Sequence, residues 1–123
     1  MAPRVLIVED EPNIAGALEF LLQHEGFDVA VESNGAHALQ RVVDLRANVV
    51  ILDVMLPNRS GFDILRDLRA TAGDAPAVLM LTAKGQARDR QAAETLGATE
   101  FMTKPFSNAE VVATVRRLAK MSA

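Results

Sequence analysis

Acidic side chains stand directly after two short apolar runs of this 123-residue chain. Asp53 follows residues 49–52, four branched apolar residues that predict a strand buried on both faces of a parallel sheet. Residues 4–8 form a second run of this kind, and the three acids at 9–11 follow it. Because open α/β folds bind their ligands at the carboxyl ends of the strands, these acids occupy a candidate site.

Two further polar residues stand at equivalent places in the second half of the chain. Thr82 follows the apolar run 77–81, and Lys104 follows the short predicted strand 100–103. Taken singly, Thr82 would be an ordinary turn residue and Lys104 a surface charge. Placed together at the rim that carries Asp53, they add a hydroxyl donor and an ammonium group. A phosphoryl group needs such surroundings: a carboxylate nucleophile, a fixed cation and a hydrogen-bond donor.

The acids also indicate a metal ion. If the ends of the first and third strands are neighbours, Glu9, Asp10 and Asp53 share one crevice. Two unit charges about 5 Å apart repel by about 3 kcal/mol at an effective dielectric constant of about 20, so a fold that brings them together usually holds a cation there. A set of oxygen ligands without His or Cys favours a hard divalent ion, and few carboxylates with room for water favour Mg²⁺ over Ca²⁺.

The elements that must position these side chains are predicted from hydrophobic periodicity. Strands are expected at residues 4–8, 27–32, 49–52, 77–81 and 100–103. Helices are expected from Pro12 to Gly26, from Ala36 to about 46, from about 62 to 69, over about 86–96 and from Ser107 onward. This alternation predicts one α/β domain over residues 1–123, a doubly wound five-stranded parallel sheet with helices on both faces. The strand order does not follow from the pattern, and 2-1-3-4-5 is the better-known solution for such a (βα)5, flavodoxin-like fold.

Two details of this prediction concern the buried face of one helix and the ends of two others. The second helix is expected to bury an apolar stripe of Ala36, Leu39, Val42 and Val43. The third is expected to end before Ala70, and Ser107 is expected to cap the last one.

Composition narrows the possible partners. A net charge of −3, five Phe and no Trp or Tyr argue against direct nucleic-acid binding, which needs a basic surface. No apolar stretch approaches the roughly 18–20 residues of a membrane span, and the N-terminus lacks a signal-peptide pattern. The absence of cysteine excludes disulfides and thiolate chemistry. We therefore expect a cytoplasmic protein with protein partners and no membrane contact.

Several separate motifs of the chain together resemble the receiver domains of two-component response regulators. The motifs are Val8-Glu9-Asp10-Glu11, Asp53 followed by Met55, Pro57 and Gly61, then Leu81-Thr82-Ala83, and finally Lys104-Pro105-Phe106. They occur in the right order and cover the whole chain, which makes the resemblance specific.

The resemblance implies a role for each residue at the crevice. Asp53 would accept a phosphoryl group from a phosphohistidine on a sensor histidine kinase or a histidine phosphotransfer protein. Asp10 and Asp53 would bind Mg²⁺ together with the backbone carbonyl of Met55, and Glu9 would act mainly through water. Lys104 would pair with the phosphoryl oxygens. Such a protein is a regulator rather than an enzyme, and assists only its own phosphorylation and dephosphorylation.

The resemblance also implies a switch. The Thr82 hydroxyl would move to meet the phosphoryl group, and Phe101 stands at the position of the family's switch aromatic. The small Ala83 would leave access for the phosphoryl group, and the Lys104-Pro105 bond resembles the family's cis peptide bond. Output would pass to a downstream protein or a fused output domain.

Two positions depart from one output class of the family. Receivers that dimerise and drive winged-helix DNA-binding domains usually carry an acidic pair before the switch aromatic and an Arg-rich last helix. Here Thr99 precedes Glu100, and Thr114 stands where an Arg is expected. The sequence therefore does not favour that class, and both a stand-alone receiver and a receiver cut from a longer protein stay open.

Three other functions fit parts of the pattern. A haloacid dehalogenase-type phosphohydrolase would need a second acid where Met55 stands, and an FMN carrier would need a phosphate cradle where the acids at 9–11 would repel one. A receiver-like adaptor could bind partners without phosphorylation, although every residue of the phosphorylation site is present here.

Overall fold

The computed structural model describes residues 2–73, 76–82 and 87–121, and in this part of the chain five strands form one sheet. The strands are β1 (Arg4–Val8), β2 (Asp28–Glu32), β3 (Val49–Asp53), β4 (Ala77–Thr82) and β5 (Glu100–Thr103). All neighbours run parallel, in the order β2-β1-β3-β4-β5. The predicted doubly wound fold and its strand order are confirmed.

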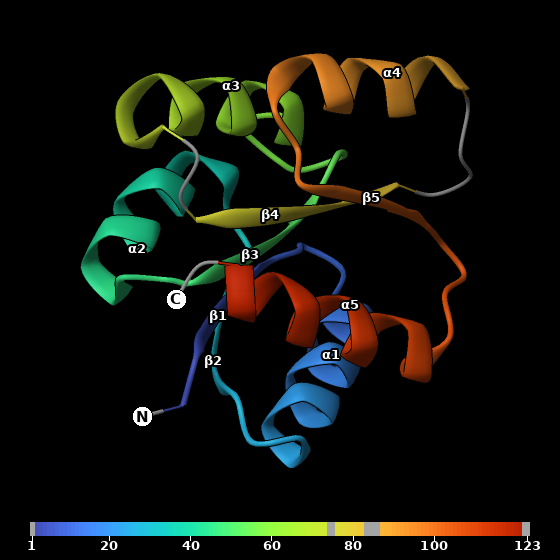
Figure 1. Cartoon of the computed structure of the whole chain (residues 1–123). Helices are drawn as coiled ribbons and strands as arrows, with labels where there is room; N and C mark the ends of the chain where they lie inside the picture. Colours follow the sequence, from blue (N-terminus) through green and yellow to red (C-terminus); the bar gives the residue numbers. More distant parts are fainter. Residues whose placement is uncertain (1, 74–75, 83–86, 122–123) are drawn as a thin grey trace.

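Helices cover both faces of the sheet (Figure 1). They are α1 (Pro12–His24), the 3₁₀ turn η1 (Gly35–His37), α2 (Ala38–Leu45), α3 (Gly61–Ala72), α4 (Ala87–Leu96) and α5 (Asn108–Met121). Helices α1 and α5 lie on one face, and α2, α3 and α4 lie on the other. Two apolar cores result, one around Ile7, Ile51 and Leu79 and the other around Leu6, Val50 and Val78. Alternate residues of β1, β3 and β4 thus point into different cores, which explains why these strands are apolar throughout.

The predicted helix starts are formed by local capping. Helix α1 begins at Pro12, a residue that suits a first helical position, and the Glu11 side chain accepts a hydrogen bond from the Asn13 amide. Helix α5 begins after Ser107, whose Oγ accepts from the Glu110 amide at 3.0 Å. The side chain that should cap the last helix therefore does so.

The second helix differs from its prediction. Residues Gly35–His37 form a 3₁₀ turn and the α-helix starts only at Ala38. Ala38 and Val42 are buried, whereas Ala36 is exposed and Val43 is 68% exposed. The prediction that Ala36 and Val43 belong to the core is wrong, because one face of a helix repeats every three to four residues and Val43 lies about 100° around the axis from Val42.

The third helix runs further than predicted. It continues to Ala72 instead of ending before Ala70. The Thr71 hydroxyl donates to the Asp67 carbonyl at 2.9 Å, one turn earlier, and the Gly73 amide closes the last turn. Thr71 therefore hydrogen-bonds within the helix rather than opening a loop. No helix among the described residues is long and apolar enough to span a membrane.

Candidate functional site

The strand order brings the acids together. Because β1 and β3 are neighbours, Glu9 and Asp10 follow one strand of the pair while Asp53 ends the other. Carboxylate oxygens of the three residues lie within 4.8 Å of one another. Glu9 is 1% exposed and Asp53 is 5% exposed, whereas Asp10 faces solvent. The predicted proximity of the three acids is confirmed.

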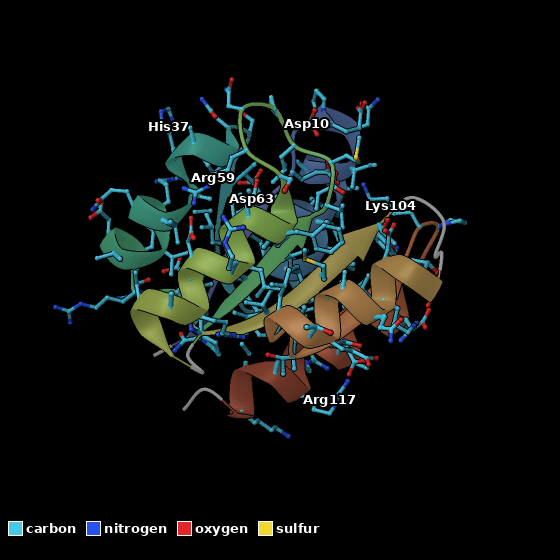
Figure 2. All side chains as sticks on the ribbon, turned by 90° about the horizontal axis from the view of Figure 1, so that it is seen from above. Asp10, His37, Arg59, Asp63, Lys104 and Arg117 are labelled. Carbon is cyan, nitrogen blue, oxygen red and sulfur yellow. The ribbon has the colours of Figure 1, made fainter. Side chains whose placement is uncertain are left out.

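Lys104 completes this crevice from the end of β5. Its Nζ donates to Glu9 Oε1 at 2.9 Å and to Asp53 Oδ2 at 3.2 Å, and its side chain is 16% exposed. Figure 2 shows Asp10 and Lys104 near one end of the molecule, with Arg117 at the opposite end. The ammonium group thus bridges two of the three carboxylates and offsets part of their repulsion.

Burial and neighbouring charges shift the pKa of two groups in this cluster, Glu9 and Lys104. Burial raises the pKa of Glu9 and the approach of Asp53 raises it further, while the hydrogen bond from Lys104 opposes both. For Lys104, burial alone would lower the pKa, but the hydrogen bond to Glu9 and the charges of both acids outweigh it and raise the pKa. Lys104 therefore stays charged at neutral pH. The Glu9–Lys104 hydrogen bond joins residues 95 positions apart. No sequence pattern indicated this direct contact, and Glu9 was expected to act mainly through water.

The loop after β3 is held tightly against the backbone of Asp53. Gly61 donates its amide to the Val54 carbonyl at 2.9 Å. A Cβ atom at Gly61 would lie 2.1 Å from the Asp53 carbonyl oxygen, so only glycine fits there. The Met55 amide lies 3.4 Å from Asp53 Oδ1. The sequence showed Gly61 only as part of a motif, and the close approach gives the physical reason for it.

Thr82 lies at the end of β4. Its side chain is buried, and its hydroxyl lies 3.5 Å from Asp89 Oδ2 in the first turn of α4, a long hydrogen bond. Asp89 was not among the residues singled out from the sequence. Ala83 lies outside the described residues, so its predicted role has no structural counterpart here.

Phe101 lies one strand further along the sheet. It is buried, and the Arg90 guanidinium lies 5.0 Å from the centre of its ring. At this distance a cation is attracted by an aromatic face. Asp89 and Arg90 are consecutive in α4, so one helical turn contacts both predicted switch residues. The Lys104-Pro105 bond is cis, as the sequence resemblance implied.

The donor set fits a hard divalent cation. The three clustered side chains offer only carboxylate oxygens, the ligands that Mg²⁺ prefers. Lys104 bonds both Glu9 and Asp53, while Asp10 faces solvent. The cluster of Glu9, Asp10 and Asp53 could therefore hold such an ion.

A doubly wound parallel sheet with acids, a lysine and a threonine at its carboxyl ends defines the class of α/β signalling or ligand-binding domains. Comparison with known proteins identifies the family within that class. The family model of the response regulator receiver domain matches residues 5–116, and the chain belongs to this family. Members of this family are signalling domains of two-component systems rather than catalytic enzymes.

Relatives and solved structures agree with this assignment. The chain is 43% identical over 116 residues to the DNA-binding response regulator MtrA of Mycolicibacterium smegmatis, covering 94% of this chain and 50% of MtrA. It is 42% identical to the probable transcriptional regulatory protein TcrX of Mycobacterium tuberculosis, covering 94% of this chain and 49% of TcrX. The chain thus spans about half the length of these relatives.

Two solved structures show the same fold. The receiver domain of Francisella response regulator 1452 superposes with a TM-score of 0.92 at 27% identity, covering 98% of this chain and 99% of the other. The chemotaxis protein CheY4 of Vibrio cholerae superposes with a TM-score of 0.89 at 28% identity, covering 96% and 99%.

Proposed function

We propose that residues 1–123 form one receiver domain in which Asp53 accepts a phosphoryl group from a phosphohistidine. The donor would be a sensor histidine kinase or a histidine phosphotransfer protein. The observation that carries this proposal is the placement of Asp53: a buried carboxylate at the end of the central strand, 3.2 Å from the Lys104 ammonium and beside two further acids.

Asp10, Asp53 and the Met55 backbone carbonyl would hold Mg²⁺, with Glu9 acting through water. When bound, the ion would neutralise charge on the phosphoryl oxygens. The negative charge of the crevice supports this assignment, because Lys104 alone cannot balance three carboxylates.

The residues of the chain can carry the transfer in one in-line step. A carboxylate oxygen of Asp53 attacks phosphorus, a P–O bond forms, the P–N bond to the donor imidazole breaks, and its electron pair stays on the imidazole nitrogen. Lys104 then turns from Asp53 to a phosphoryl oxygen. The Thr82 hydroxyl leaves Asp89 for another oxygen, and Phe101 moves with it as the switch residue. Hydrolysis of the acyl phosphate in the same crevice would reset the domain.

The output is proposed to pass through protein contacts. MtrA and TcrX are named for DNA binding and transcription, and the chain matches about half of each. We propose that this domain acts on a downstream protein or a fused output domain and does not itself bind nucleic acid. Thr99 and Thr114 still depart from the residue pattern of winged-helix regulators. A cytoplasmic location, where the donor proteins would meet it, belongs to the same proposal.

Phosphorylation of Asp53 is the first prediction to test. Wild type and Asp53→Asn are incubated with acetyl phosphate and Mg²⁺, and intact mass is followed. Wild type should gain one phosphoryl group and the variant none, because the side-chain amide of asparagine is not a nucleophile under these conditions, whereas the carboxylate of Asp53 is. Equal modification of both would assign another acceptor. No modification of either, also with a cognate kinase, would favour the adaptor that acts by binding alone.

A further inference from the structure

The loop between β3 and α3, residues 54–60, carries the Met55 carbonyl proposed as a metal ligand. Three of its side chains are exposed, because Met55 is 74% exposed and Pro57 and Asn58 also face solvent. Gly61 holds the loop at its base, against Asp53. The position of the tip, residues 57–59, therefore depends on the element against which it rests.

That element is the turn before α2. Gly35 is buried, and a Cβ atom there would lie 2.5 Å from the Arg59 carbonyl oxygen and 3.1 Å from the Pro57 carbonyl oxygen. Ordinary contact begins at 3.4 Å. Both neighbours are backbone atoms, so a side chain at Gly35 would displace the loop itself. The requirement for glycine is steric, since Gly35 has no positive φ.

Asn34 ties the same tip by hydrogen bonds. Its Oδ1 accepts from Asn58 Nδ2 at 2.9 Å and from the Ala36 amide at 2.9 Å. Asn58 has a left-handed backbone with φ of 69°, which asparagine tolerates better than most residues. Figure 2 shows Arg59 between α2 and α3, where it forms an ion pair with Asp67. The tip is thus held from the turn on one side and from α3 on the other.

We propose that Asn34 and Gly35 are positioning residues for the metal and phosphoacceptor site, because they set the height of the loop that presents the Met55 carbonyl beside Asp53. This inference rests on the proposed function. Mg²⁺ demands near-ideal octahedral geometry, so a carbonyl displaced by part of an ångström binds it poorly. The turn that follows β2, an edge strand without a proposed ligand, would therefore control affinity at the centre of the sheet.

Gly35→Ala tests the steric contact, with Gly16→Ala as the matched control. Gly16 lies in α1 with nothing within 4 Å of its added Cβ. Mg²⁺ is titrated by calorimetry at a temperature where circular dichroism shows each protein folded. Gly35→Ala should bind Mg²⁺ about tenfold or more weakly, the usual effect of disturbing a ligand's support, and Gly16→Ala should match wild type. The rate of phosphorylation by acetyl phosphate should fall in parallel.

The outcomes separate this inference from the proposed function. If wild type neither binds Mg²⁺ nor accepts phosphate, the proposed function is wrong. If wild type does both and folded Gly35→Ala binds Mg²⁺ equally well, the positioning role is wrong and Gly35 serves stability alone.

Asn58→Gly provides a second test that does not depend on whether Gly35→Ala folds. It removes the bond to Asn34 but keeps a residue that adopts positive φ readily. We expect Mg²⁺ affinity to fall by roughly two- to tenfold, the effect of one hydrogen bond. In the double variant with Gly35→Ala the losses should be less than additive, because both changes release the same tip. Unchanged affinity in Asn58→Gly would overturn the role of Asn34.

Discussion

At the scale of residues, the crevice balances repulsion among three acids against one ammonium group. Lys104 reaches Glu9 and Asp53 but makes no direct contact with the exposed Asp10 among the interactions of the described residues. Net negative charge therefore remains, and the free protein is strained electrostatically. In the proposed function, a bound cation would relieve this repulsion.

Asp10→Asn should relieve the strain without metal. In EDTA at neutral pH we expect its melting temperature to exceed that of wild type by roughly 2–6 °C, the shift that about 1 kcal/mol gives in a domain of this size. In millimolar Mg²⁺ the difference should narrow or reverse, because wild type gains RT ln(1 + [L]/Kd) and the variant gains little. If Mg²⁺ does not raise the melting temperature of wild type, the assignment of Asp10 as a metal ligand is wrong.

Glu9 should give the crevice a pH dependence. Burial raises its folded-state pKa above the usual 4.5, so the folded protein holds this proton more tightly than the unfolded chain. Stability from this group is present below pH 4.5 and is lost as pH rises through the folded pKa. Glu9→Gln keeps an oxygen acceptor for Lys104 but cannot ionise.

The measurement is the difference in unfolding free energy between Glu9→Gln and wild type, in EDTA. This difference should move in favour of the variant as pH rises from 4.5 upward. A difference that stays flat from pH 4 to pH 7 would contradict a raised pKa for Glu9.

At the scale of elements, the first turn of α4 links the two predicted switch residues. Asp89 contacts the Thr82 hydroxyl and Arg90 covers the ring of Phe101. In the proposed function, the Thr82 hydroxyl would leave Asp89 to meet a phosphoryl group at Asp53. Because these contacts join α4 to β4 and β5, we expect switching to change α4 and β5 together, while the helices on the opposite face need not take part.

Asp89→Ala should make the proposed switching more favourable, because it removes the acceptor that holds the Thr82 hydroxyl. Freeing Thr82 from a hydrogen bond worth about 0.5–1.5 kcal/mol should strengthen binding of beryllofluoride, a phosphoryl mimic, by roughly two- to tenfold. Glu94→Ala, an exposed acid on the same helix, is the control and should behave as wild type. Amide exchange on adding beryllofluoride should change more over residues 82–106 than over 27–45. Equal beryllofluoride affinity in the two variants would remove Asp89 from the switch.

At the scale of the whole molecule, the site and a second polar network occupy opposite ends of the sheet. Before β4 begins, the Arg69 guanidinium donates to the carbonyls of Gly97 at 2.8 Å and Pro76 at 2.7 Å, and its Nη2 lies 3.4 Å from Thr99 Oγ1. The Thr99 hydroxyl also accepts from the Val78 amide at 3.0 Å. The threonine that departs from the acidic pattern of some family members thus has a structural role here.

Arg69→Met should lower stability and leave the site intact. At least four acceptors, the carbonyls of Gly73, Pro76 and Gly97 and the Thr99 hydroxyl, lose a charged donor, so we expect a loss of roughly 1–3 kcal/mol in unfolding free energy. Arg66→Met, on the same helix, should cost less than about 1 kcal/mol, because among the described residues Arg66 pairs with the partly exposed Asp63 and Asp67. Urea unfolding gives both values. Mg²⁺ affinity of folded Arg69→Met should equal that of wild type, and a weakened affinity would show that the two ends are coupled.

The sequence by itself determined the elements and the chemical set. Apolar runs with an acid, threonine or lysine directly after them place a side chain at a strand end, because the apolar run and the strand end at about the same residue. Asp53, Glu9, Asp10, Thr82 and Lys104 were therefore identifiable, although their roles stay predictions. Helix faces were less certain, as Val43 shows, because a stripe one residue too wide still fits the helical period.

Only the tertiary structure decided which of these side chains meet. The bond from Lys104 to Glu9 and the pairing of Thr82 with Asp89 depend on strand order and helix placement, which local patterns do not encode. The contact of Gly35 with the Arg59 carbonyl is decided in the same way. A glycine in a turn has the same sequence signature whether it supplies conformational freedom or empty space, and only its packed neighbours show that here it supplies space.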